Sequence, residues 1–134
     1  MAKKISHLGI AVKDLAASEA LFAKLLGTNE IHHEVVEDQG VEIASFKIGD
    51  SIIELTAATS PDSPIARFLE KRGEGIHHIA LEVDDIAAEL ERLKGEGIRL
   101  IDEAPRDGAH NMRIAFLHPK STGGVLVELC EIKK

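Results

Sequence analysis

The sequence predicts one α+β domain, residues 1–134, built from two βαβββ modules. Three observations support this fold class. The segment HLGIAVKDL (7–15) matches HIALEVDDI (78–86) at an offset of 71 residues. Each copy continues with one helical pattern and three strand patterns. The last strands also match, because DSIIELT (50–56) and GVLVELC (124–130) both place a glutamate before a leucine.

The first repeat spans about 4–58 and opens with a strand that ends before Asp14, a suitable helix N-cap. Gly27 suits the end of that helix. Between them, one apolar helix face is expected from Leu15, Phe22, Leu25 and Leu26. Turn residues then separate three expected strands at 30–36, 41–48 and 51–57.

A linker helix over about 62–73 joins the repeats, with Ser63 before Pro64 as its start. The second repeat covers about 75–132, and Asp85 caps its helix. Its apolar helix face comprises Ile86, Leu90 and Leu93. Its last three strands are expected at 98–102, 112–117 and 124–131.

Strand alternation turns four polar side chains away from the core: His7, Glu54, His78 and Glu128. They can converge on one open face if the sheets of the two repeats join. In each repeat a histidine opens the first strand and a glutamate lies within the last, opposite bulky apolar neighbours. Two imidazoles and two carboxylates form a suitable ligand set for a divalent transition metal. Burying them together without a cation is costly. The repeat therefore predicts a metal site, although each residue alone is also consistent with a half-exposed or hydrogen-bonded polar position.

His77, adjacent to His78, is expected on the opposite face as a structural residue or one that supports the ligands. The other histidines lie outside the repeat. His32 and His33 fall in a charged strand end, whereas His110 and His118 lie in loops that could line a pocket. Cys130 is interpreted as a small buried apolar residue.

Composition excludes several other classes. The formal charge is −7, there is no Trp or Tyr, and no basic run occurs, so nucleic-acid binding is not expected. The chain shows no signal-peptide pattern and no apolar run of about 18 residues, which argues against a membrane span. A single cysteine fits a cytoplasmic location.

The sequence resembles the vicinal oxygen chelate superfamily over nearly its whole length and, within it, the methylmalonyl-CoA epimerase family. The resemblance implies that the two paired βαβββ modules form a cupped, eight-stranded mixed sheet. The closer match is in EDQGV (37–41), DSPIARFLEKRGEGIHHIALEVDDI (62–86) and FLHPKSTGGVLVEL (116–129). The resemblance implies His7, His78 and Glu128 as metal ligands, with Glu54 at a fourth position where some members carry Gln. The ion would be divalent, with Co²⁺ expected and Mn²⁺, Ni²⁺ or Zn²⁺ as alternatives.

The resemblance further implies interconversion of the (R) and (S) forms of methylmalonyl-CoA, by removal and return of the C2 proton through a metal-stabilised enolate. Glu128 is expected as one base. The second base is expected to be Glu42, with Glu37 as the fallback because the alignment after QGV may need a one-residue gap. Lys120, Ser121 and Arg106 are possible rim contacts for the CoA thioester, although simple exposure also explains them. A homodimer is expected from the family.

Two other functions fit the same sequence. A glyoxalase I-type lactoylglutathione lyase uses a comparable ligand set, although the HPKSTGG segment and the linker favour the epimerase. A non-enzymatic member of the superfamily would bind a small molecule without turnover. An extradiol dioxygenase fits less well, since such iron sites need two histidines, one carboxylate and open positions.

Overall fold

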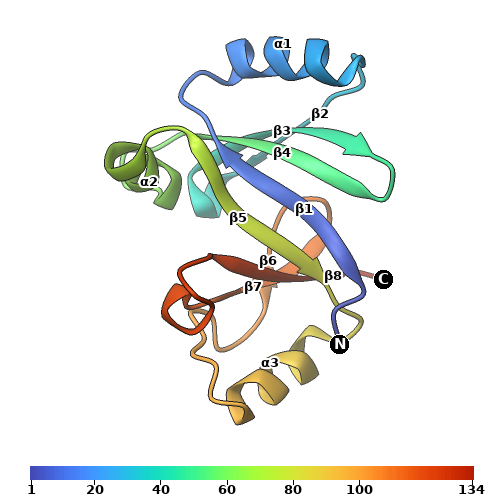
Figure 1. Ribbon diagram of the computed structural model, residues 1–134, viewed down its shortest axis with the longest axis vertical. Helices are drawn as coiled ribbons and strands as arrows, with labels where there is room; N and C mark the ends of the chain where they lie inside the picture. The colour runs from blue at the N-terminus through green and yellow to red at the C-terminus, as the bar shows by residue number, and fades with distance from the viewer. The chain divides into compact units, whose positions relative to one another are not determined.

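A computed structural model describes all 134 residues as eight strands, three α-helices and two short 3-10 helices (Figure 1). The strands are β1 (Lys4–Ala11), β2 (His32–Val36), β3 (Val41–Ile48), β4 (Ser51–Ala58), β5 (Gly75–Glu82), β6 (Arg106–Asp107), β7 (Met112–Leu117) and β8 (Val127–Ile132). The helices are α1 (Leu15–Leu26), α2 (Pro64–Arg72) and α3 (Ile86–Gly95), with η1 (Glu37–Gln39) and η2 (Pro119–Ser121). The strands form one mixed sheet in the order β2-β3-β4-β1-β5-β8-β7-β6, with β5 and β8 parallel. This confirms the predicted α+β class.

The chain divides into two compact units that differ from the sequence repeats. Unit A is Leu8–His77, and unit B combines Met1–His7 with His78–Lys134. Strands β1 and β5 pass through both units. As a result, both histidines that open the repeats belong to unit B, whereas Glu54 belongs to unit A.

In unit A, α1 lies over β3 and β4 (Figure 1). The Asp14 carboxylate accepts the Ala17 N–H at 3.1 Å, and Gly27 ends the helix at φ +68°, as expected. Phe22 packs with buried Phe46 and Leu55, together with Leu15 and Leu26. Leu25, predicted on this face, is 69% exposed instead. Placing Leu25 in the core was wrong because it lies about 100° around the helix from Leu26, which packs on the sheet.

Two further turns of unit A follow the sequence pattern. The Ser63 hydroxyl accepts the Ala66 N–H at 3.1 Å and starts α2 at Pro64. Gly40 ends η1 at φ +63°, and an added Cβ there would lie 3.0 Å from the Ser63 Cβ. The QGV turn therefore needs glycine for its backbone conformation and for its close approach to the start of α2.

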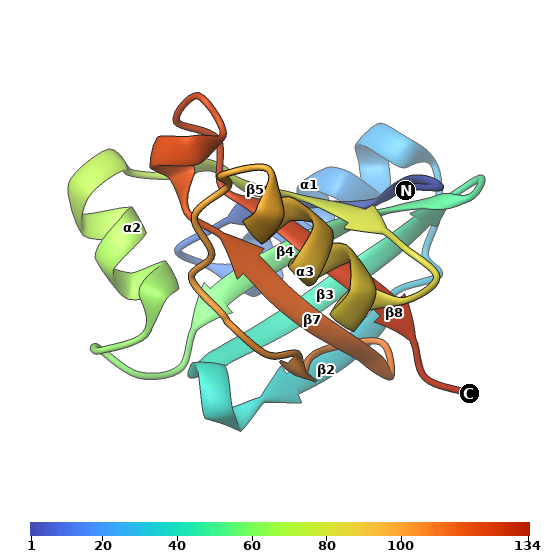
Figure 2. The ribbon, with the colours of Figure 1, turned by 90° about the horizontal axis from the view of Figure 1, so that it is seen from below.

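In unit B, α3 lies across β7 and β8 (Figure 2). Asp85 accepts the Ala88 N–H at 3.1 Å, and Glu131 accepts the Ile86 N–H at 2.9 Å. The helix contributes buried Ile86 and Leu90 to a core that includes Leu117 and Leu129 from the sheet. Leu93, predicted on the same face, packs against this core. None of the three helices is long and apolar enough to cross a membrane.

Two strand predictions in unit B were wrong. Residues 98–102 form no strand, and only Leu100 makes an isolated bridge, to Leu117. The carboxylate of Asp102 instead accepts the Phe116 N–H at 2.8 Å, and the short strand β6 pairs with β7 further along. Strand β8 begins at Val127 rather than 124, because Gly123 and Gly124 have φ of +69° and +90° and prolong the preceding turn.

Candidate metal centre

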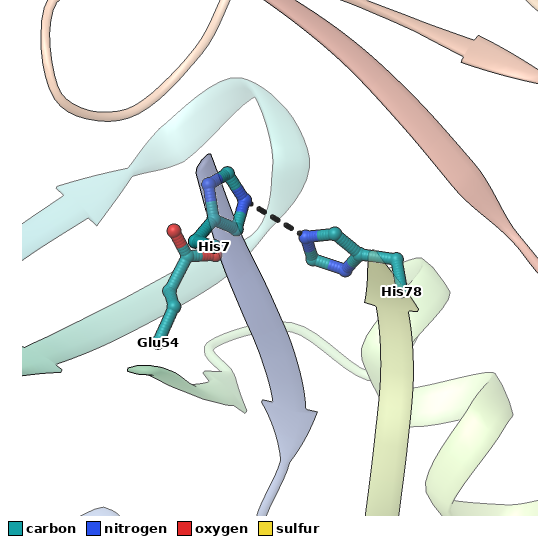
Figure 3. A group of neighbouring side chains, drawn as sticks. All are labelled: His7, Glu54 and His78. Carbon is teal, nitrogen blue, oxygen red and sulfur yellow. Dashed lines mark hydrogen bonds between the residues drawn. The ribbon is translucent and has the colours of Figure 1, made fainter. Parts of the chain in front are cut away.

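The candidate centre is built around the imidazoles of His7 on β1 and His78 on β5, which face each other within unit B (Figure 3). Their Nε2 atoms lie 3.2 Å apart, and the rings meet edge to face at a centroid distance of 5.2 Å. The two residues are only 3% and 6% exposed. The side chain of His78 thus takes the direction that the repeat predicts.

Glu128 joins the two histidines from β8. One carboxylate oxygen lies 3.5 Å from the His7 Nε2, and the other lies 3.4 Å from the His78 Nε2. The neighbours Val127 and Leu129 face the core beneath α3, so strand alternation turns Glu128 to the opposite face. The structure therefore brings together three of the four predicted ligands within unit B.

The donor set and its spacing fit a divalent metal ion. Two imidazole nitrogens bound to one ion at about 2.1 Å each lie roughly 3.0–3.4 Å apart for tetrahedral or octahedral angles. The observed Nε2–Nε2 distance of 3.2 Å lies in this range. A carboxylate that is 4% exposed between two imidazoles needs a compensating positive charge, which a divalent ion would supply.

Neighbouring side chains hold this group in place. The Ser6 Oγ lies 3.3 Å from the His7 Nδ1, so a ring that binds through Nε2 donates its Nδ1 proton to the hydroxyl. Phe116 on β7 is directly opposite Glu128 in the strand register and meets the His78 ring edge to face at 5.7 Å. An aromatic wall therefore lies beside both His78 and Glu128.

Glu54, the fourth predicted ligand, lies on β4 in unit A and is 4% exposed. The strand register places it opposite Ser45, on the face that Thr56 shares. Leu55 lies on the other face, in the core with Phe46. Within unit A, Glu54 therefore lies on the face opposite Leu55, as strand alternation predicted.

His77 lies in unit A and has a structural contact. Its ring packs edge to face on Phe68 of α2 at 5.0 Å. Burial lowers the pKa of His77 to about 4, and the negative charge of Glu54 opposes this shift only in part. The ring is therefore neutral at pH 7, which agrees with the structural role expected for it.

Glu42 points away from the face that carries Glu54. It is opposite Ala57 in the register between β3 and β4, whereas Ser45 is opposite Glu54. Residues 42 and 45 are an odd number of positions apart, so their side chains lie on opposite faces of the sheet. The structure thus gives Glu42 no support as the second base. Glu37, the fallback, is exposed on η1.

The structure adds one neighbour of the centre, His110, that the repeat could not identify. Its ring centroid lies 6.2 Å from that of His7. His110 and Asn111 have φ of +59° and +55°, a conformation that non-glycine residues seldom adopt. Asparagine is enriched there, so the GAHN turn carried a weak signal.

The remaining histidines and the cysteine have other places. His32 and His33 are exposed on β2 beside Glu34 and Glu19 respectively. The His118 Nδ1 accepts the Lys120 N–H at 3.1 Å and caps η2. Cys130 is fully buried among apolar side chains, which confirms its interpretation.

Comparison with known proteins finds a matching family model and relatives of similar length. Residues 6–116 match the family model of the Glyoxalase/Bleomycin resistance protein/Dioxygenase superfamily. The ethylmalonyl-CoA/methylmalonyl-CoA epimerase of Cereibacter sphaeroides is 40% identical over 98% of this chain and 100% of its own.

Solved structures of methylmalonyl-CoA epimerases are similar to this chain in fold and sequence. A variant of Streptomyces coelicolor methylmalonyl-CoA epimerase in complex with 2-nitronate-propionyl-CoA has a TM-score of 0.95 at 38% identity. A methylmalonyl-CoA epimerase in complex with methylmalonyl-CoA and NH4+ gives the same two values. Each match covers 98% of this chain and 96% of the other.

Proposed function

We propose that this chain interconverts the two C2 epimers of methylmalonyl-CoA. The premise is that the chain belongs to the glyoxalase/bleomycin resistance protein/dioxygenase superfamily and, within it, to the methylmalonyl-CoA epimerase family. The observation that carries the proposal is the buried group of His7, His78 and Glu128. An epimerase of this kind must remove a weakly acidic C–H proton between a thioester and a carboxylate. A buried carboxylate beside a metal site is suited to that step.

The proposed ligands of the metal are His7, Glu54, His78 and Glu128. The residue types and burial of the first three suit an ion, and the contacts within unit B support Glu128. Glu54 is included because it occupies the place in the first repeat that Glu128 occupies in the second. A bound divalent ion would act as a Lewis acid toward the thioester and carboxylate oxygens of the substrate.

The protein's own residues account for one proton transfer. Glu128 takes the C2 proton from one face of the substrate and returns it there. Burial keeps its carboxylate out of bulk water. Phe116, directly opposite on β7, covers one side of it with an apolar ring. The hydrogen bond from the His7 Nδ1–H to the Ser6 hydroxyl fixes the His7 ring so that its Nε2 stays directed at Glu128.

Inversion also needs a proton-transfer group on the opposite face of the planar enolate. The candidates for this group are Glu42 and Glu37, which were predicted from the sequence, and His110, whose ring lies next to that of His7. The variants Glu42→Gln, Glu37→Gln and His110→Gln separate them. Loss of the acting residue leaves exchange of the C2 proton in one epimer but abolishes inversion, whereas a variant with full exchange and full epimerisation is removed from the mechanism.

The finer properties are also proposals. Cobalt is proposed as the metal and a homodimer as the assembly, both from the family resemblance. A cytoplasmic location is proposed from the single cysteine. Metal analysis of protein purified without added metal tests the first. Light scattering of the same protein tests the second.

The activity itself is tested with methylmalonyl-CoA in deuterated water. We expect deuterium at C2 and equilibration of the two epimers, with both rates lost after chelation and restored by added Co²⁺. Hemithioacetal isomerisation without C2 exchange would replace the epimerase with a glyoxalase I-type lyase. Tight binding of the thioester by metal-free protein without turnover would point instead to a binding protein.

A further inference from the structure

We propose that Arg106 binds an anionic oxygen group of the acyl-CoA substrate, either its carboxylate or a phosphate of the coenzyme. This inference rests on the proposed function and extends it to substrate recognition. The protein carries a formal charge of −7, and its proposed substrate is itself a multiple anion. Electrostatic repulsion therefore requires a local cation where the substrate binds.

The strand register places Arg106 on the face that carries Glu128. In the β6–β7 pairing Arg106 is opposite Ile114, and Ile114 is opposite Cys130 on β8. Cys130 is two residues from Glu128, so the two share a face. Arg106 is the only lysine or arginine at the strand positions of unit B that point to this side.

The guanidinium of Arg106 is held next to the candidate centre through one aromatic ring. Its Cζ lies 5.7 Å from the centroid of Phe116, in a cation–π arrangement. The same ring meets His78 edge to face at 5.7 Å. Phe116 therefore connects the cation to one of the proposed metal ligands.

Asp102 fixes the orientation of this arginine. One carboxylate oxygen lies 3.3 Å from the Arg106 Nε, and the other accepts the Phe116 N–H at 2.8 Å. The contact is made at Nε, so the two terminal nitrogens remain in a planar fork. Such a fork matches the paired oxygens of a carboxylate or phosphate. With 43% of its side chain exposed, Arg106 is accessible to a ligand.

Arg113 provides a matched control. It is 45% exposed, it pairs with Glu131 at 3.5 Å, and it lies next to Ile114 on the opposite face of β7. Arg106→Gln and Arg113→Gln thus remove the same charge from neighbouring exposed positions on the two faces. Bound Co²⁺ and its absorption spectrum show whether either change disturbs the metal centre.

The test measures dissociation constants of the Co²⁺-loaded proteins by calorimetry. Methylmalonyl-CoA should bind Arg106→Gln roughly 10- to 100-fold more weakly than wild type, as for loss of a charge-assisted hydrogen bond. Arg106→Lys should recover part of this loss, and Arg113→Gln should bind within about twofold of wild type. In turnover, KM should rise while kcat changes little.

Two truncated probes identify the anionic group. Methylmalonyl-N-acetylcysteamine keeps the carboxylate without phosphates, and CoA keeps the phosphates without the carboxylate. If Arg106→Gln weakens binding of the N-acetylcysteamine thioester only, Arg106 binds the carboxylate. If it weakens binding of CoA only, Arg106 binds a phosphate. Wild-type affinity of Arg106→Gln for methylmalonyl-CoA overturns the inference. Failure of wild-type protein to bind methylmalonyl-CoA or exchange its C2 proton overturns the proposed function instead.

Discussion

Glu54 and Glu128 occupy equivalent positions in the two repeats, but the residues opposite them in the strand register differ. Glu54 on β4 is opposite Ser45, a small polar residue. Glu128 on β8 is opposite Phe116, a large aromatic one. Both glutamates are 4% exposed. The repeat therefore places two buried carboxylates in the same backbone setting with different side-chain neighbours.

This difference indicates a division of roles. Beside Glu128 the ring of Phe116 contacts both His78 and Arg106, so unit B holds the residues proposed for proton removal and for substrate recognition. Opposite Glu54 in the strand register lies the small hydroxyl side chain of Ser45, which suits a ligand whose task is to add negative charge. We infer that Glu128 both binds the metal and moves the proton, whereas Glu54 only binds.

The largest effect is expected at the adjacent histidines, which belong to different units. His78→Ala removes a ligand nitrogen 3.2 Å from that of His7. We expect the affinity for the metal to fall by more than the roughly 10- to 100-fold that follows from mutating a residue that only supports a ligand. His77→Ala should keep its metal, because that ring packs on Phe68. Equal loss in both variants, measured by metal analysis of folded protein, would contradict the assignment of His78.

The second prediction separates the two glutamates. Glu128→Gln should lower the rate of C2 deuterium exchange roughly 10²- to 10⁴-fold, the usual contribution of a general base. Glu54→Gln keeps a ligand oxygen and should reduce exchange far less, mainly through weaker metal binding. The rates of C2 deuterium exchange of both variants are measured at saturating Co²⁺ and compared. The division of roles fails if the two variants lose activity equally under these conditions.

Much of the centre could be predicted because a repeat supplies two independent placements of each residue type. His7, His78 and Glu128 were identified from the register of the repeat together with strand alternation, and all three meet within unit B. Glu42 shows the limit of a motif match. The strand registers place both Glu42 and Arg113, its equivalent in the second repeat, on the face opposite to that of the glutamates, which the motif match could not show.

Other features depended on contacts that the sequence does not encode locally. Residues 98–102 were predicted as a strand from their apolar pattern. In the structure the hydrogen bond from Phe116 N–H to Asp102 replaces a continuous strand pairing there. The role proposed for Arg106 likewise depends on the ring of Phe116, ten residues further along the chain.

The smallest expected effect compares the helices of the two repeats, α1 and α3, and tests how far their sequence similarity extends. Leu90 on α3 is 3% exposed, whereas Leu25 on α1 is 69% exposed. Leu90→Ala should lower the free energy of unfolding by about 2–5 kcal/mol, because it leaves a cavity under α3. Leu25→Ala should change it by less than about 0.5 kcal/mol. Urea unfolding of both variants measures the difference, and comparable losses would show that Leu25 is packed as tightly on α1 as Leu90 is on α3. The two repeats would then share their helix packing as well as their strands, and their difference would be confined to the residues opposite Glu54 and Glu128.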